Sequence, residues 1–262
     1  MKPMRAVADE VREVARTYAL DHYLAALLAR RASRDDLVVL AAFLGDVARI
    51  PLTVREPMLV EIRLQWWRDA LEAPADTGDT GNPVADAMRD LARRHRLETA
   101  PIVALLEAQG MLVDQGSLAD EAGVREFLGA TEGTAMRLAA RLAGADPQPW
   151  QEGLAAAARA YASCRMMRDS SRLEALGHLP LGARTGPAML RDIARTELAQ
   201  ARARLAGAPR QIVDAALPAA LVEPYLRALE RRPPESGAGP GDIAPLSRVW
   251  RLWRAHRRGR IE

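Results

Sequence analysis

The sequence predicts an all-α protein. Alanine, leucine and arginine dominate its 262 residues, and alternating strand patterns are hard to find. Apolar residues instead recur at the three- and four-residue spacing of helices along almost the whole chain. Apolar residues make up 49% and charged residues 27%, which is ordinary for a globular protein with a substantial core. We therefore expect a single helical bundle.

Local signals place the helices in order along the chain. Pro57, Pro83 and Pro101 each favour a helix start, because the first helical residue needs no hydrogen-bonded N–H. Pro51 ends the second helix, and Gly144 ends the sixth. The expected helices span residues 5–31, 34–50, 57–72, 83–97, 101–115, 121–143, 149–175, 186–206 and 210–231.

These helices are expected to form one domain over residues 1–232. Residues 233–244 are rich in proline and glycine and are typical of a linker. They lead to a basic tail helix at 245–262. No internal repeat occurs at a fixed period, which argues against a solenoid.

Several classes of protein are excluded by composition. The longest uncharged stretches are nine residues, as in 37–45, too short for a helix that spans a bilayer. Asp9, Glu10 and Glu13 fit neither a secretory leader nor a mitochondrial one. The single Cys164 excludes an internal disulfide and a multi-cysteine metal site. The sequence thus predicts a reduced, cytoplasmic protein.

The helix expected at 57–72 is dense in candidate functional residues. One of its faces carries an apolar stripe made of Met58, Leu59, Ile62 and Trp66. Polar groups lie on its other faces, among them Glu61, Gln65, Arg68 and Asp69. Two interpretations are open: a wide buried face with ordinary ion pairs, or a helix that lines a cavity with polar groups among aromatics.

The pattern of the tail predicts a basic amphipathic helix. One side carries Val249, Leu252, Trp253 and His256, with Trp250 at its edge. Such a helix suits an anionic membrane surface, so we expect membrane contact through Trp250, Arg251, Trp253, Arg254 and Arg258. In the alternative, the apolar side packs back on the bundle. Nucleic-acid binding is not expected, because no second basic face supports it.

The order of the segments resembles the squalene/phytoene synthase family. The landmarks that carry the resemblance are Asp21 and Tyr23, Ala42, Phe43 and Asp46, Glu56, Pro57 and Arg63, Trp67, Arg68 and Asp69, Asn82 to Ala85, Thr131 and Gly133, Arg168 and Asp169, and Gly177, Leu179 and Pro180. The pairing of residues 62–69 with Phe43 and Asp46 is most similar to a divergent branch of that family. This branch includes a mitochondrial respiratory complex I assembly factor related to phytoene synthase.

The resemblance implies a bundle of the isoprenoid synthase type, in which two acidic motifs flank a central cavity. Family enzymes use paired carboxylates to hold Mg²⁺, which neutralises a diphosphate leaving group. Here the expected acid positions are occupied by Ala48, Arg49, Leu52, Arg172 and Leu173. Only Asp46 and Asp169 remain as remnants of catalytic carboxylates. We therefore expect no metal site and no cofactor.

Arginines can bind an anion directly, without a metal ion. The residues expected to line the ligand-binding cavity are Phe43, Arg49, Arg63, Gln65, Trp66, Trp67, Arg68, Asp69, Arg168 and Arg172. A prenyl diphosphate or a phospholipid headgroup would fit such a site. In the alternative interpretation, these arginines pair with neighbouring acids in a purely structural network.

From the resemblance we expect a non-catalytic protein that acts near the membrane. Its role would be that of a respiratory complex I assembly factor, with respiratory-complex subunits as partners, or of an isoprenoid- or lipid-binding protein. It would be cytoplasmic or peripheral on the inner membrane. The alternative is an active prenyltransferase that joins two prenyl diphosphates, with Mg²⁺ held by Asp46, Asp169 and Glu174.

Overall fold

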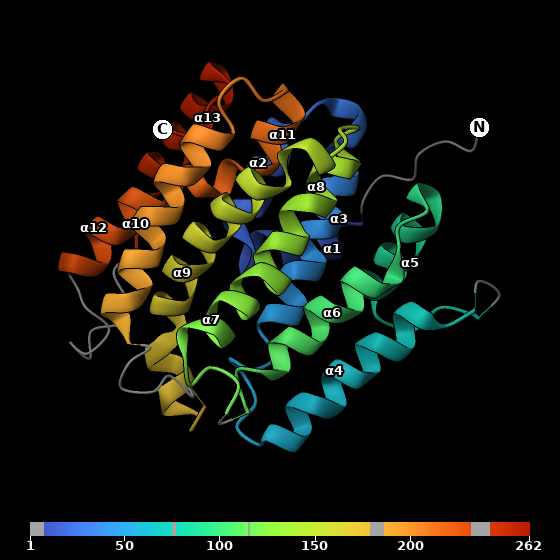
Figure 1. Cartoon of the computed structure of the whole chain (residues 1–262). Coiled ribbons are helices and arrows are strands. Elements are labelled where there is room, and N and C mark those ends of the chain that lie inside the picture. Colours follow the sequence, from blue (N-terminus) through green and yellow to red (C-terminus); the bar gives the residue numbers. More distant parts are fainter. Residues whose placement is uncertain (1–7, 75–76, 115, 179–185, 232–241) are drawn as a thin grey trace.

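The computed structural model describes residues 8–74, 77–114, 116–178, 186–231 and 242–262. These residues form helices and short connections, with no strand among them (Figure 1). The all-α prediction is therefore confirmed. The helices are α1 (Asp9–Tyr18), α2 (Leu20–Leu28), α3 (Arg31–Ala48), α4 (Pro57–Glu72), α5 (Pro83–His95), α6 (Thr99–Gly110), α7 (Glu121–Leu128), the π-helix η1 (Gly129–Gly133), α8 (Thr134–Leu142), the 3₁₀ helix η2 (Gln148–Trp150), α9 (Gln151–Ala175), α10 (Pro187–Arg204), α11 (Arg210–Ala215), the 3₁₀ helix η3 (Leu217–Leu221), α12 (Val222–Arg231) and α13 (Pro245–Arg258).

Two buried helices organise the bundle. α9 runs through its middle and packs along α10 and η1 (Figure 1). Nearly every residue of α3 from Asp36 onward is buried, and this helix packs against α1 and α2. α4 lies at the periphery beside α6 (Figure 1). A central cavity lies between the end of α3 and α9.

Three of the predicted helices are interrupted. The one expected at 5–31 breaks at Ala19, whose backbone lies at φ −139° and ψ 46°, and again before α3 begins at Arg31. The one expected at 210–231 is divided into α11, η3 and α12. The one expected at 121–143 contains the π-helix η1, which buries Thr131 and Glu132. Because π-turns carry an extra residue, they often mark functional sites.

The buried face of α4 is not the one that the sequence predicted. Val60, Leu64 and Trp67 face the core, whereas the predicted stripe is exposed. The exposed side chains are Met58, Leu59, Ile62 and Trp66. The buried and the exposed residues both have helical spacing, and α6 packs against the buried face. The interpretation of α4 as a helix with a wide buried face that includes the predicted stripe is therefore wrong.

The tail helix α13 packs against the bundle, mainly on η3 and α2. Leu252 and Ala255 are buried in this contact, and so is Arg248. Val249 and Trp253, which were expected to share the apolar side with Leu252, are instead exposed. The helix thus docks through one narrow face and leaves a second apolar face free.

Some predicted features lie outside the described residues. These are Leu179, Pro180 and the part of the expected linker from 233 to 241. In the described ranges, no helix has both the length and the apolar character that crossing a membrane requires.

Candidate functional site

A cavity of about 310 Å³ lies between the N-terminal half of the bundle and α9. Its walls come from the end of α1, α2, the end of α3, α9, α12 and the start of α13. The charged side chains that line it are Asp21, Arg49, Arg165, Arg168, Asp169, Asp242 and Arg248. Four arginines thus meet three carboxylates around one chamber.

Asp21 forms the centre of a buried cluster at one wall. Tyr161 Oη and Tyr225 Oη each donate a hydrogen bond to its Oδ2, at 2.8 and 2.6 Å. Arg248 Nε lies 2.8 Å from Oδ1, in an ion pair whose two side chains are about 95% buried. Burial, and then the charge of Asp21, raise the pKa of both tyrosines, so their hydroxyls stay protonated donors. The cluster ties α2, α9, α12 and α13 together.

A second buried cluster centres on Glu132, which the π-helix η1 turns inward. Its carboxylate accepts from Arg165 Nη1, and His22 Nε2 lies 3.0 Å from its other oxygen. Burial alone would raise the pKa of Glu132, but the charges of His22 and Arg165 outweigh it and lower the pKa to about 2. Glu132 is therefore a firmly ionised partner of Arg165.

Asp169 lies where the cavity meets a smaller inner pocket. Burial raises its pKa, an effect that Arg165, Arg168 and Arg172 oppose. Three arginines thus surround the one acid that remains of the second motif. The positive charges of these arginines favour the binding of an anion here, and they disfavour the binding of a metal cation by Asp169.

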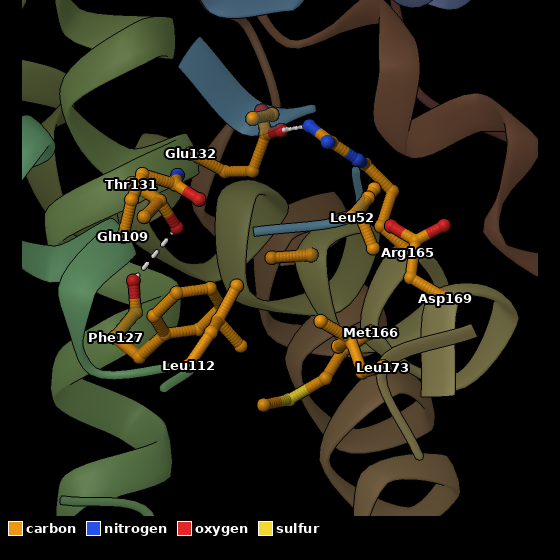
Figure 2. Close-up of a pocket in the computed structure, with 12 residues that line it drawn as sticks. Leu52, Gln109, Leu112, Phe127, Thr131, Glu132, Arg165, Met166, Asp169 and Leu173 are labelled. Atoms are coloured by element: carbon orange, nitrogen blue, oxygen red, sulfur yellow. Dashed lines mark hydrogen bonds and ion pairs between the residues drawn. The ribbon is translucent and has the colours of Figure 1, made fainter. Parts of the chain in front are cut away.

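The inner pocket is mostly apolar (Figure 2). Arg165 and Asp169 lie at its polar side, and the rest of its wall includes Leu112, Phe127 and Met166. Its volume of about 40 Å³ leaves room for only a few water-sized groups. The polar cavity thus adjoins an apolar inner pocket, an arrangement that suits a ligand with a charged head group and an apolar chain. A long chain would have to push side chains of the inner pocket aside.

The structure divides the predicted cavity residues among three places. Arg49, Arg168 and Asp169 line the central cavity. A separate surface pocket of about 140 Å³ collects Asp46, Arg63, Trp66 and Trp67, and Arg49 borders it as well. Asp46 accepts a hydrogen bond from Arg49 Nε at 2.6 Å there. The two remnant carboxylates, Asp46 and Asp169, therefore do not meet at one site.

The other predicted residues lie away from the cavity. Phe43 is fully buried in the core, edge-on to Trp67 with ring centroids 5.3 Å apart. Gln65, Arg68 and Asp69 form a hydrogen-bonded chain on the outside of α4. There Gln65 Nε2 donates to Asp69 Oδ1 and Arg68 Nη1 donates to Gln65 Oε1, each at 2.6 Å. Of the ten residues expected to line the cavity, Arg49 and Arg168 are the two that do so, and the other eight positions correct the prediction.

Arg172 and the tail residues are also placed by the structure. Arg172 Nε donates to the backbone oxygen of Leu52 at 2.6 Å, which bridges the second motif to the loop after α3. Trp250 and Trp253 stack on the surface with ring centroids 5.1 Å apart. Arg254 and Arg258 both pair with Glu262. Arg251 lies on the same helix, partly exposed.

Sequence reasoning missed several residues of the cavity wall as site residues. These are Asp21, Tyr161, Arg165, Tyr225, Asp242 and Arg248. Tyr161, Arg165 and Arg168 follow the spacing of one helical face that also includes Asp169, so that signal was present in the sequence. Arg248 carried no such signal, because Asp21, its buried partner, lies at the other end of the chain.

The cavity does not fit the Mg²⁺ ions that paired carboxylates would hold. Mg²⁺ needs several oxygen ligands in near-octahedral geometry. Asp21 is paired with Arg248, and Asp169 is surrounded by arginines. Asp46 lines a different pocket. Within the described ranges, no three His, Cys, Asp or Glu side chains gather closely enough to hold a metal ion.

The described residues form a helical bundle with a charged cavity between facing helices, which is the arrangement of an isoprenoid synthase fold. The sequence model of squalene/phytoene synthase matches residues 15–185, so the chain belongs to the squalene/phytoene synthase family. The structure is similar to the squalene synthase HpnC from Alicyclobacillus acidocaldarius, with a TM-score of 0.63 and 18% sequence identity. That match covers 88% of this chain and 94% of the other, and it shows a shared fold. No curated protein matches the chain significantly.

Proposed function

We propose that the protein is a non-catalytic member of its family that binds an isoprenoid or lipid phosphate in the central cavity, without a metal ion. The single observation that carries this proposal is the set of arginines at the cavity wall. Arg49, Arg165, Arg168 and Arg248 line it, whereas its acids are paired with or surrounded by arginines. A guanidinium binds a phosphate directly through parallel hydrogen bonds.

Within this set, Arg168 is the arginine best placed for a ligand. Its guanidinium carbon lies 4.5 Å from the centroid of the Tyr225 ring, which orients the group toward the chamber. Its Nε is buried and has no hydrogen-bond partner among the described residues. A phosphate oxygen would satisfy that buried donor.

The test is a calorimetric titration with farnesyl diphosphate, first with Mg²⁺ and then with excess chelator. We expect binding that survives the chelator and weakens at least about tenfold in Arg168→Ala, since a charge-assisted hydrogen bond is worth about 1.5–3 kcal/mol. Arg63→Ala is the matched control, because Arg63 borders the separate surface pocket. Binding that requires Mg²⁺ would revive the alternative of an active prenyltransferase. A phospholipid with the same phosphate chemistry, titrated in parallel, distinguishes the two ligand sources.

We also propose a peripheral contact with anionic membranes through the outer face of α13. Trp250 and Trp253 are 56% and 40% exposed, beside Leu246 and Val249. Arginines of the same helix surround these side chains, so the surface combines apolar insertion with charge attraction. The double change Trp250→Ala with Trp253→Ala should reduce sedimentation with vesicles that contain an anionic lipid. Trp66→Ala, an exposed tryptophan of α4, should leave it unchanged.

A role in assembling a respiratory complex is the second candidate function. It is supported by the exposed apolar stripe of α4, where Met58 is 71% and Ile62 is 56% exposed. Exposed apolar patches of this kind often mark protein–protein contacts. If this role holds, deletion of the gene should lower the amount of assembled complex I and leave isoprenoid products unchanged. The change Ile62→Glu should have the same effect without loss of folded protein.

A further inference from the structure

The arginines of the cavity already hold an anion that belongs to the chain itself. Asp242 Oδ1 lies 2.7 Å from Arg248 Nη2 and 3.5 Å from Arg168 Nη2. Two guanidinium groups from different helices therefore converge on one carboxylate oxygen. Asp242 stands three residues before the first residue of α13, at the rim of the cavity.

The two arginines are held in place by other groups besides Asp242. Arg248 pairs with Asp21, and its Nη2 donates to Tyr225 Oη at 3.1 Å. The guanidinium carbons of Arg168 and Arg248 lie 4.5 and 6.0 Å from the centroid of the Tyr225 ring. Because these contacts do not involve Asp242, the arginines would keep their positions if its carboxylate left. Such preorganisation favours the binding of a replacement anion.

Asp21 and Asp242 differ in how easily they can leave. Asp21 is 4% exposed and accepts hydrogen bonds from two tyrosines. The side chain of Asp242 is 53% exposed and can turn into water. Without Asp242, Arg248 would still pair with Asp21, whereas Asp169 would be the carboxylate left to act on Arg168. The exchangeable partner of the arginine pair is therefore Asp242.

We propose that Asp242 is a built-in competitor at this arginine pair, so that an anionic ligand has to displace its carboxylate in order to bind. A singly charged phosphodiester would only replace one negative charge with another. A diphosphate brings several negative charges and more acceptor oxygens. Its exchange for Asp242 therefore lowers the free energy, whereas the exchange of a diester for Asp242 leaves it nearly unchanged. This inference rests on the proposed function and adds to it a regulatory contact at the same site.

The test compares inorganic pyrophosphate with dimethyl phosphate in calorimetric titrations with chelator present. The wild-type protein should bind dimethyl phosphate at least about tenfold more weakly than pyrophosphate. Asp242→Asn should bind pyrophosphate about tenfold more tightly than wild type, because the ligand no longer displaces a carboxylate. Glu230→Gln is the matched control, since Glu230 pairs with Arg195 on the surface. Adding Arg168→Ala to Asp242→Asn should abolish the gain.

The outcomes separate this inference from the proposed function. If wild type and Asp242→Asn bind pyrophosphate equally, Asp242 is no competitor, while the anion site stands. If dimethyl phosphate binds wild type as tightly as pyrophosphate, a ligand does not have to outcompete a carboxylate at the arginine pair, and the inference is wrong. If neither protein binds pyrophosphate or farnesyl diphosphate, the anion site and the competitor both fall. Circular dichroism of each variant verifies that the fold is intact.

Discussion

Removing the guanidinium of Arg248 is expected to destabilise the whole domain. Arg248 is 5% exposed, and it reaches from the tail helix to the buried carboxylate of Asp21. The change Arg248→Ala leaves that carboxylate without its cation, and breaking a buried pair from one side costs about 3–5 kcal/mol. Tyr161 and Tyr225 still donate to Asp21, so the lower end of this range applies. We expect a loss of about 3 kcal/mol in the free energy of unfolding.

Urea unfolding followed by far-UV circular dichroism measures this loss. Arg254→Ala is the matched control on the same helix, because Arg254 is exposed and pairs with Glu262. An exposed pair of this kind is worth about 0–1 kcal/mol. The reasoning is refuted if the two variants unfold at the same urea concentration. A double variant, Arg248→Met with Asp21→Asn, should be more stable than Arg248→Ala, since it removes both charges together.

Three further predictions concern the core and the cavity. Trp67→Ala should cost about 3–5 kcal/mol of unfolding free energy and Trp66→Ala less than about 1, since only Trp67 is buried; equal losses in urea unfolding would contradict the assigned faces of α4. Burial raises the pKa of Cys164 to about 12, so a thiol reagent should modify it only after unfolding, and rapid labelling of the native protein would show that Cys164 is accessible. The pKa of Glu132 is about 2 in the folded protein and 4.5 in the unfolded chain, so on acidification the unfolded chain binds the proton first. The free energy of unfolding should therefore fall by roughly 3 kcal/mol as the pH drops from 4.5 to 2. Asp169, whose pKa folding raises, acts in the opposite direction, and a melting-temperature profile against pH should become flatter in Glu132→Gln.

The helices were largely predictable because their signals are local. α4 begins at Pro57 and ends at Glu72, as expected, since a proline at the first position and a polar loop mark its two ends. The break at Ala19 was missed, because neither proline nor glycine marks it. Its conformation is set by packing: a Cβ added at Gly45 would lie 2.9 Å from the Cβ of Tyr18, so α3 passes very close to the end of α1.

The candidate site was predictable only in part. The loss of the paired acids and the presence of Arg49 and Arg168 at the cavity follow from counting along the family's motifs. The outward stripe of α4 could not be told from the inward one, because both have helical spacing and the neighbouring helix selects between them. A residue such as Phe43 was assigned to the cavity through its place beside a motif, although its side chain faces the core.

The sequence by itself determined the class of fold, the family and the absence of a paired-carboxylate pattern, because each of these depends on the type, order and spacing of residues along the chain. The tertiary structure decided which charges meet. Arg248 belongs by sequence to a solvated basic tail, but it is buried because Asp21 and Tyr225 stand opposite it. The pairing of Arg248 with Asp21 joins residues more than 200 positions apart, and the energy of burying a charge depends on the partner that folding brings to it.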